Sequence, residues 1–209
     1  MANAPVTVAL TGASGTIYGL KLIESLVQQQ IPVYLLISKA ARLVLSMEND
    51  IKLPAGTDQT ADYFSDYFSA DPGLIRVFGQ QQWTAPVASG SNPARAMVIA
   101  PCTTGTLSAV ACGASNNLIE RAADVMLKER RKLIMLVRET PLSEIHLENM
   151  LKLCRMGSVI MPADPGYYFK PQSIDDLVDF IVARLLDHLG VSHQLHQRWG
   201  ELDLNQSND

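Results

Sequence analysis

Two short segments of this chain combine glycine with hydroxyl side chains in a pattern that suits an oxyanion. One is Thr11-Gly-Ala-Ser-Gly15 and the other is Thr103-Thr-Gly-Thr106. Each follows an apolar run and precedes a helical pattern, so backbone N–H groups at a helix N-terminus can point at a phosphate. A single loop of this kind would equally fit an ordinary glycine turn or N-cap. Two such loops favour a ligand that carries phosphate.

Charged side chains that could handle protons or anions occur in two further places. Arg138 and Glu139 follow an apolar run, and the Glu139 carboxylate could transfer a proton or simply pair with a cation. Arg121, Asp124 and Lys128 are spaced i, i+3 and i+7, which puts them on one face of a helix. That face would serve an anionic substrate or would only be solvated, and the residues alone leave both interpretations open.

Histidine and cysteine spacing predicts neither a metal site nor a disulfide. The spacing of the histidines fits no zinc fingerprint: His146, His188, His193 and His196. The cysteines are three in number and form no C-x-x-C pair, which is typical of reduced thiols in the cytoplasm: Cys102, Cys112 and Cys154. A nucleophilic Cys102 would have no histidine near it in the sequence.

The elements that must position these residues alternate between apolar strands and helices. Strands are predicted at Val6–Leu10, Val33–Ile37, Met97–Ala100, Leu133–Val137 and Val159–Met161. Three helices are predicted in the first half of the chain: one that ends at Gln29, one that begins at Ser38 and one that begins at Thr103. Three more are predicted after them: Leu118–Arg130, a helix from an N-cap at Thr140 to Arg155, and a helix from a capping box at Ser173–Asp176 to Leu189. The stretch Pro54–Gly90 is expected to be irregular, with a short helix around Ala61–Phe68.

This alternation predicts a single α/β domain with a doubly wound parallel sheet between two helical layers. In such a sheet ligands bind beyond the carboxyl ends of the strands, where the glycine loops, Ser38, Arg138 and Glu139 would meet. A chain of 209 residues that is 47% hydrophobic can bury one core, so one domain is expected over residues 1–209, with residues 192–209 as a polar tail.

Charge and hydropathy exclude several other classes of protein. The net charge is −4 and no basic stripe covers the chain, which argues against nucleic-acid binding. The uncharged stretch Ala96–Ala114 contains Pro101, Gly105 and Gly113, so it indicates a buried strand, turn and helix and not a membrane span. The first residues carry no signal-peptide pattern, and a cytoplasmic location is expected.

Seven segments in order, covering nearly the whole chain from Val6 to Glu201, resemble the UbiX flavin prenyltransferases. They are Thr11-Gly-Ala-Ser-Gly15 with Tyr18-Gly19, Leu36-Ile-Ser-Lys-Ala40, Pro101-Cys-Thr-Thr-Gly-Thr-Leu-Ser-Ala-Val110, Asn116–Asp124 with Leu127-Lys-Glu-Arg130, Arg138-Glu-Thr-Pro141, His146-Leu-Glu-Asn-Met150 and Pro165-Gly-Tyr-Tyr168. Thr103 stands where many members carry serine, and the likeness is weakest from Leu53 to Gln82.

The resemblance implies a Rossmann-like or flavodoxin-like fold and a dodecamer with FMN at subunit interfaces. It implies that reduced FMN receives, at N5 and then C6, the dimethylallyl group of dimethylallyl monophosphate, without a metal. The prenylated FMN would serve a UbiD-type decarboxylase, linked to ubiquinone biosynthesis. By the same resemblance, FMN would be held by Gly12, Ala13, Ser14, Ser38, Thr103, Thr104, Gly105, Thr106 and Arg138.

The resemblance also implies roles for residues around the prenyl donor. The donor's phosphate would be bound by Arg121, Lys128, Tyr168 and Arg184. Protons would be handled by Ser14, Glu48 and Glu139, which with Lys128 form the expected catalytic set. Trp199 would close over the site and Trp83 would help to wall the prenyl pocket.

Three alternatives are weaker fits to the same residues. A short-chain nicotinamide reductase would need an acidic residue after the second strand and a Tyr-x-x-x-Lys pair, and the sequence has neither. An FMN-dependent cysteine decarboxylase of related fold would need a histidine near the first helix, whereas the first histidine is His146. A non-enzymatic flavin carrier would not need the Arg121 and Lys128 face or the Tyr167-Tyr168 pair.

Overall fold

A computed structural model of the chain describes residues 4–196, which divide into two compact units between Ala163 and Asp164. The first unit contains a parallel sheet whose six described strands run in the order β3-β2-β1-β4-β5-β6. The chain first adds strands on one side of β1 and then, from β4 onward, on the other side, which is the order of a Rossmann-type doubly wound fold. The strands are β1 Val6–Leu10, β2 Val33–Ile37, β3 Ile75–Phe78, β4 Ala96–Cys102, β5 Lys132–Val137 and β6 Val159–Pro162.

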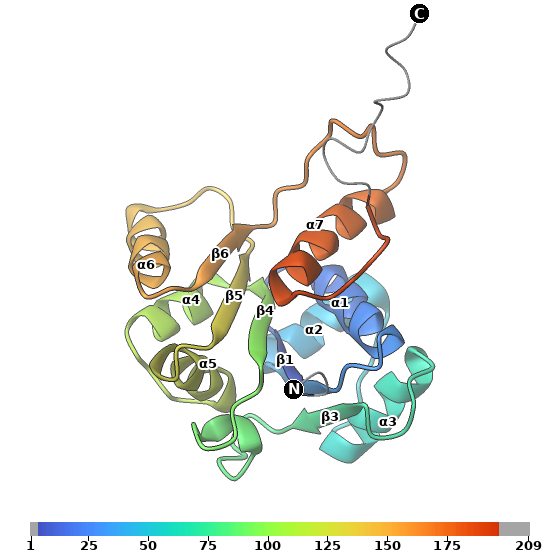
Figure 1. Cartoon of the computed structure of the whole chain (residues 1–209), viewed down its shortest axis with the longest axis horizontal. Coiled ribbons are helices and arrows are strands. Elements are labelled where there is room, and N and C mark those ends of the chain that lie inside the picture. The colour runs from blue at the N-terminus through green and yellow to red at the C-terminus, as the bar shows by residue number, and fades with distance from the viewer. Residues whose placement is uncertain (1–3, 197–209) are drawn as a thin grey trace, which may run out of the picture. The chain divides into compact units, whose positions relative to one another are not determined.

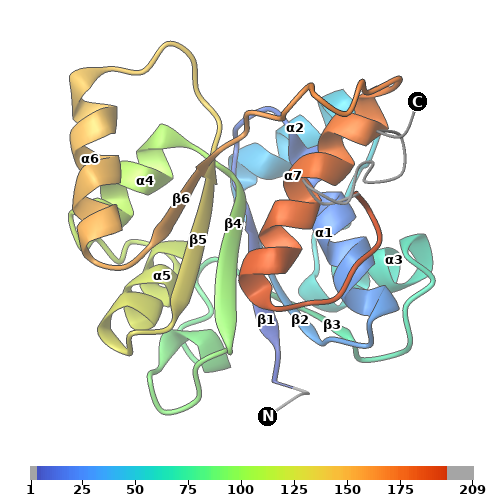
Figure 2. The ribbon, with the colours of Figure 1, turned by 45° about the horizontal axis from the view of Figure 1, so that its top comes forward.

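Helices cover both faces of the sheet, so the predicted three-layer α/β architecture is confirmed (Figure 1). Helix α1 packs on β1, β2 and β4, whereas α4 and α5 pack on β5. Figure 2 shows α1 and the helices α4, α5 and α6 on opposite sides of the sheet. Because both faces are covered, every residue of β1 and β4 is buried. The helices of this unit are α1 Thr16–Gln28, α2 Lys39–Asn49, α3 Thr57–Tyr67, α4 Thr104–Ala111, α5 Leu118–Lys128 and α6 Glu144–Arg155, with a 3-10 turn at Pro86–Ala88.

Close packing of α1 on the sheet depends on Gly19. A Cβ on this residue would collide with the side chain of Leu10 on β1 and with the carbonyl oxygen of Ala100 on β4. Glycine therefore lets the helix lie directly over the two central strands. These are the strands at whose carboxyl ends the predicted ligand site lies.

The stretch from Pro54 to Gly90 contains the predicted short helix but is less irregular than expected. It contains α3, which begins at Thr57 and not near Ala61, and the edge strand β3. The strand β3 is only four residues long, and the exposed Arg76 interrupts its run of apolar residues. An edge strand needs a partner on one side only, so its sequence lacks the continuous apolar run of a central strand.

Two other boundaries differ from those predicted. Helix α6 begins after Ser143, whose hydroxyl accepts from the N–H of His146 while the imidazole Nδ1 accepts from the N–H of Ser143. The reciprocal capping by Ser143 and His146 replaces the predicted N-cap at Thr140. Strand β4 extends to Cys102, beyond the predicted end at Ala100, with an irregular register between Ile99 and Cys102 that accommodates Pro101.

The second unit is built around α7, Ile174–Leu189. The predicted capping box is confirmed, because the Ser173 hydroxyl accepts from the N–H of Asp176 and the Asp176 carboxylate accepts from the N–H of Ser173. Gly190 ends the helix in the left-handed conformation at φ 66°. Whether the chain forms a single domain over residues 1–209 stays a prediction. Among the described residues, none of the helices combines the length and apolar character that crossing a bilayer requires.

Candidate active site

The carboxyl ends of β1 and β4 are tied together by one buried threonine. The hydroxyl of Thr11 donates to the carbonyl oxygen of Pro101 at 2.7 Å and accepts from the N–H of Thr103 at 2.9 Å. Thr11 is only 2% exposed. The two predicted oxyanion loops therefore lie side by side where the strand order reverses, which is the position at which doubly wound sheets bind ligands.

The second loop forms the N-terminus of α4, as predicted. Thr103 is the N-cap, and its hydroxyl accepts from the N–H of Thr106 at 3.1 Å. Because the first turn of a helix lacks internal acceptors, the N–H groups of Thr104 and Gly105 are left for another partner. A Cβ on Gly105 would come no closer than 3.9 Å to Thr103, so this turn is open to an incoming group. These donors suit an oxyanion such as a phosphate group.

The loop after β2 joins the same edge through Ser38. Its N–H donates to the carbonyl oxygen of Leu10 at 3.0 Å, and its hydroxyl caps α2 by accepting from the N–H of Ala41 at 3.0 Å. A Cβ on Gly12 would collide with the side chain of Ala40 in α2. Glycine at position 12 therefore allows the loop after β1 and the start of α2 to approach each other.

The first loop does not leave the N-terminus of α1 free. The Glu48 carboxylate of α2 accepts from the N–H of Gly15 at 2.9 Å, and from the N–H and hydroxyl of Thr16 at 3.1 and 3.0 Å. Partial desolvation raises the pKa of Glu48, but hydrogen bonds from Ser14, Gly15 and Thr16 outweigh it and hold the pKa below its usual value. An ionised carboxylate that is bonded to Ser14 thus occupies the position where a phosphate was expected.

Arg138 and Glu139 extend the same edge beyond β5. The N–H of Arg138 donates to the carbonyl oxygen of Cys102 at 3.2 Å. The Glu139 carboxylate accepts from the N–H of Thr140 at 3.1 Å and from the hydroxyl of Thr104 at 3.4 Å. An exposed carboxylate therefore lies beside the open first turn of α4, within reach of a ligand bound there.

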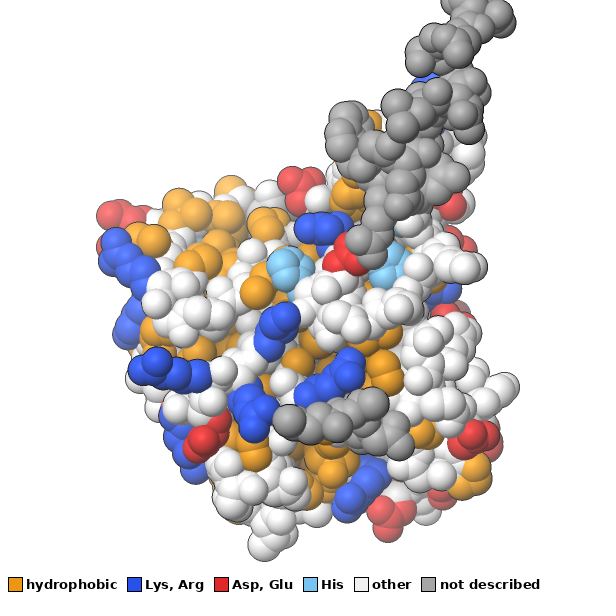
Figure 3. Space-filling model, in the orientation of Figure 1, with side chains coloured by type: hydrophobic (Ala, Val, Ile, Leu, Met, Phe, Trp, Pro, Cys, Tyr) orange, Lys and Arg blue, Asp and Glu red, His pale blue; other side chains and the backbone are white. Residues whose placement is uncertain are grey.

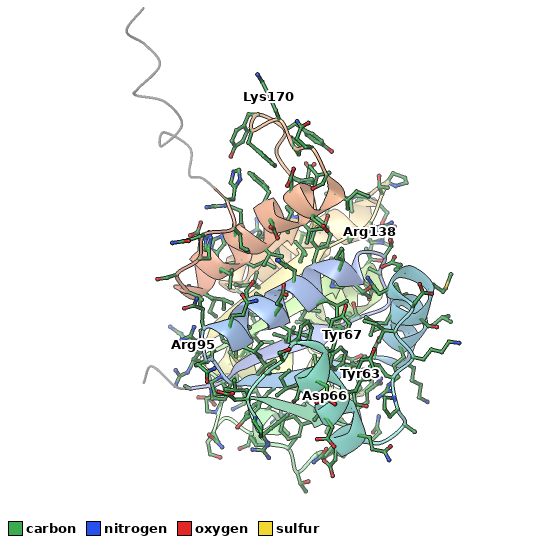
Figure 4. All side chains as sticks on the ribbon, turned by 90° about the vertical axis from the view of Figure 1, so that its right-hand side faces the viewer. Tyr63, Asp66, Tyr67, Arg95, Arg138 and Lys170 are labelled. Atoms are coloured by element: carbon green, nitrogen blue, oxygen red, sulfur yellow. The ribbon has the colours of Figure 1, made fainter. Side chains whose placement is uncertain are left out.

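Lys128 lies at the other edge of the sheet from these loops. It ends α5, four residues before Lys132, which pairs with Ala96 at the amino end of β4. A Cβ on Gly90, before β4, would collide with the Lys128 ammonium group. Figure 4 shows the two edges, with Arg95 before β4 on one side and Arg138 after β5 on the other. Seven residues of β4 separate the edges by about 20 Å.

The predicted Arg121, Asp124 and Lys128 face is confirmed as a helical stripe but is partly engaged within the chain. Arg121 donates to Asp124 at 2.8 Å and to the carbonyl oxygen of Ala88 at 3.0 Å. Lys128 pairs with Glu129 and is 45% exposed. Lys128 stands at the C-terminal end of α5 and Arg121 is bonded to Ala88, which precedes β4. Neither contact brings its cation to the carboxyl edge of the sheet.

The remaining predicted residues lie outside this cluster. Trp83 is 46% exposed in the segment after β3. Tyr168 and Arg184 belong to the second unit, where Tyr168 precedes α7 and Arg184 is paired with Asp187 at 3.0 Å. Trp199 lies outside the described residues.

Cys102 is not suited to act as a nucleophile. It is fully buried in β4, and desolvation raises the pKa of its thiol far above the usual value. Two residues that were not among the predicted site residues shape the site. Thr11 joins two strand ends and Thr16 holds Glu48, and both act through contacts more than 30 positions apart that no local pattern reveals.

The chain matches known proteins over nearly its whole length. The Flavoprotein family model matches residues 1–186. Flavin prenyltransferase UbiX of Pseudomonas aeruginosa is 58% identical over 199 residues, which cover 95% of each chain. Flavin prenyltransferase UbiX of Aquifex aeolicus is 44% identical, over 93% of this chain and 97% of that one.

A crystal structure of AnUbiX (PadA1) in complex with FMN and dimethylallyl pyrophosphate superimposes with a TM-score of 0.84. It is 38% identical and the match covers 94% of this chain and 97% of that one. Because the family model spans most of the chain and the Pseudomonas relative matches nearly all of it, this chain belongs to the UbiX family of flavin prenyltransferases.

Proposed function

We propose that the protein joins the dimethylallyl group of dimethylallyl monophosphate to reduced FMN, at N5 and then at C6. The observation that carries the proposal is the meeting of three groups at one sheet edge. These are the open first turn of α4, the Ser14–Glu48 pair at α1, and the Arg138-Glu139 segment after β5. Membership of the UbiX family of flavin prenyltransferases supports prenyl transfer as the reaction at this site.

FMN would be held by residues from four strand ends, and it supplies the nucleophilic ring positions when bound. The N–H groups of Thr104 and Gly105 and the hydroxyls of α4 would bind its phosphate. The side chain of Arg138 would add a cation at the same edge. The other expected contacts come from the loops after β1 and β2: Gly12, Ala13, Ser14 and Ser38.

The donor's phosphate needs cations, because cleavage of its C–O bond leaves negative charge on the phosphate. Lys128 is about 20 Å from the carboxyl edge of its own sheet, so a second copy of the chain would have to supply it. Figure 3 shows Lys and Arg side chains gathered over α5 and α6, where Arg130, Arg131, Lys132 and Arg155 line one hollow. This basic edge suits contact with a phosphate group bound at the site of a neighbouring copy.

We therefore expect a homo-oligomer in which each site is completed by another copy, and a dodecamer is the predicted form. A relative of 36% identity and TM-score 0.81 is described as a dodecameric FMN-dependent Ubix-like decarboxylase from Escherichia coli O157:H7, matched over 93% of this chain and 98% of that one. Tyr168, Arg184 and Trp199 would complete the phosphate site, and Trp83 the prenyl pocket.

Proton transfer would fall to the two carboxylates. Glu48 is ionised and accepts a hydrogen bond from Ser14, so it would hold that hydroxyl with its oxygen free to accept a proton. Ring closure at C6 needs one proton added to the prenyl double bond and one removed from C6, and Glu139 beside α4 would remove the second. Passage of the product to a UbiD-type decarboxylase, a link to ubiquinone biosynthesis and a cytoplasmic location stay predictions.

The direct test is anaerobic incubation of the purified protein with FMN, dithionite and dimethylallyl monophosphate without added metal. Mass spectrometry of the flavin should show the addition of one prenyl unit, and dimethylallyl pyrophosphate should be tested in parallel. Unmodified FMN that stays bound would favour a flavin carrier. Decarboxylation of phosphopantothenoylcysteine in place of prenyl transfer would favour the cysteine decarboxylase alternative.

A further inference from the structure

An acidic residue near the C-terminal end of α7 links two basic side chains. Asp187 lies two residues before the end of this helix, where the helix dipole disfavours a negative charge. One of its carboxylate oxygens accepts from Arg184 Nη1 at 3.0 Å, and the other contacts His193 Nε2 at 3.3 Å. Because an ionised carboxylate can only accept, Nε2 of His193 must carry the proton in this contact.

His193 is placed on Asp187 by the end of the helix. Gly190 adopts φ 66°, and the N–H groups of Gly190 and Val191 donate to the carbonyl oxygens of Asp187 and Leu186, so the chain turns back over the last turn. The His193 side chain is only 6% exposed, and its Nδ1 is buried without a hydrogen-bond partner among residues 4–196. Burial of the unpaired Nδ1 costs free energy, and the contact of Nε2 with Asp187 offsets part of that cost.

The contact with Asp187 restricts the Arg184 side chain. Its side chain is 53% exposed, and a free arginine side chain samples many rotamers. Phe180, Arg184 and Asp187 are spaced i, i+4 and i+7 and share one stripe of α7. The Tyr168 ring packs on Phe180 with centroids 5.9 Å apart. Both phosphate ligands expected from this unit, Tyr168 and Arg184, therefore belong to one ordered surface of the second unit.

We propose that Asp187 and His193 are positioning residues that fix the Arg184 guanidinium for the phosphate of the prenyl donor. This inference rests on the proposed function, since it takes Arg184 as a phosphate ligand. The hydrogen bond to Asp187 restricts the orientation of the Arg184 guanidinium, and the contact with His193 restricts the Asp187 carboxylate. A guanidinium held in place before binding loses less conformational freedom when it meets the phosphate.

The test compares Asp187→Asn with Glu24→Gln, which breaks a matched i, i+3 pair with Lys21 at 3.1 Å on α1. Asp187→Asn should raise KM for dimethylallyl monophosphate by about 10-fold or more, with a smaller change in kcat and unchanged affinity for FMN. Glu24→Gln should behave as the wild type. His193→Ala should act in the same direction as Asp187→Asn, and His193→Gln, which keeps an N–H donor, should restore most of the lost affinity.

A double-mutant cycle separates positioning from a general structural role. In an Arg184→Ala background, Asp187→Asn should have no further effect on KM, because there is no guanidinium left to position. An effect of Asp187→Asn that persists at full size in that background, or a KM equal to that of Glu24→Gln, would overturn the inference. A wild-type protein that forms no prenylated flavin would instead remove the proposed function on which it rests.

Discussion

Thr11 and Thr103, 92 positions apart, are joined by a hydrogen bond of 2.9 Å from the Thr103 N–H to the Thr11 hydroxyl. The same hydroxyl donates to Pro101, so one buried side chain sets the distance between the loop after β1 and the N-terminus of α4. Every flavin contact proposed at these two loops depends on that distance. The geometry of the site is thus fixed by a residue that need not touch the flavin.

Replacement of Thr11 by valine tests this link. Valine keeps the shape but leaves the part-buried N–H of Thr103 without its acceptor, which should cost about 1–3 kcal/mol in the free energy of unfolding. The Pro101 carbonyl oxygen loses the hydroxyl donor and keeps the backbone N–H of residue 11, at 3.3 Å. Urea denaturation at fixed protein concentration would measure the loss, and FMN affinity should fall as well. Thr11→Ser, which keeps the hydroxyl, is the control and should stay close to the wild type. Equal stability of the valine and serine variants would contradict this role.

Gly12 and Ala40 provide a second test of how the loops approach. Gly12→Ala places a Cβ against that of Ala40, and overpacking of this kind costs about 1–3 kcal/mol. Adding Ala40→Gly should recover part of the stability and of the FMN affinity, although glycine in α2 carries its own cost. Thermal unfolding of both single variants and the double variant gives the coupling between the two positions. Strict additivity would mean that the two side chains do not meet.

The lowered pKa of Glu48 predicts a pH dependence of stability. A carboxylate whose pKa is lower in the folded than in the unfolded state stabilises the protein above its unfolded pKa, and this contribution is lost as pH falls through the folded pKa. The stability difference between the wild type and Glu48→Gln should therefore be constant near neutral pH and shrink in acid. Thermal unfolding from about pH 7 to about pH 3 measures it. A difference that does not change with pH would refute an ionised, hydrogen-bonded Glu48.

Glu139→Gln should separate the two bond-forming steps. An amide keeps the contact with the Thr104 hydroxyl but cannot remove a proton, so the bond at N5 should form while ring closure at C6 slows by about 10²-fold or more. Since the open and closed products have the same mass, absorbance and NMR spectra must distinguish them. Glu144→Gln, in the first turn of α6, is the control. Ring closure at the wild-type rate in Glu139→Gln would assign that proton to another group.

The alternation of strands and helices made the central part of this fold predictable from sequence, and so did the positions of its glycine loops. Strand β3 was missed because Arg76 breaks its apolar run and an edge strand tolerates that. The N-cap of α6 was misplaced because Thr140-Pro141 and Ser143 both carry capping signals, and only the contact with His146 decides between them.

The long-range contacts of the site could not be predicted from local sequence patterns. The Glu48 carboxylate meets Gly15 from 33 positions away, so a helix end that looks open in the sequence is closed in the structure. The place of Lys128 follows from topology, since a helix that leads directly into β5 must end near the amino edge of the sheet. Its place at the opposite edge from Arg138 is the reason for the proposal that a second copy supplies it.

A mixed-subunit experiment tests the shared site most directly. Lys128→Ala and Arg138→Ala should each abolish most prenyl transfer, and differently tagged copies of the two variants can be co-expressed and purified as mixed oligomers. If each site takes Arg138 from one copy and Lys128 from another, random mixing leaves about a quarter of the sites intact, and about a quarter of wild-type activity should return. Mixed oligomers no more active than either variant alone would contradict a site shared between copies.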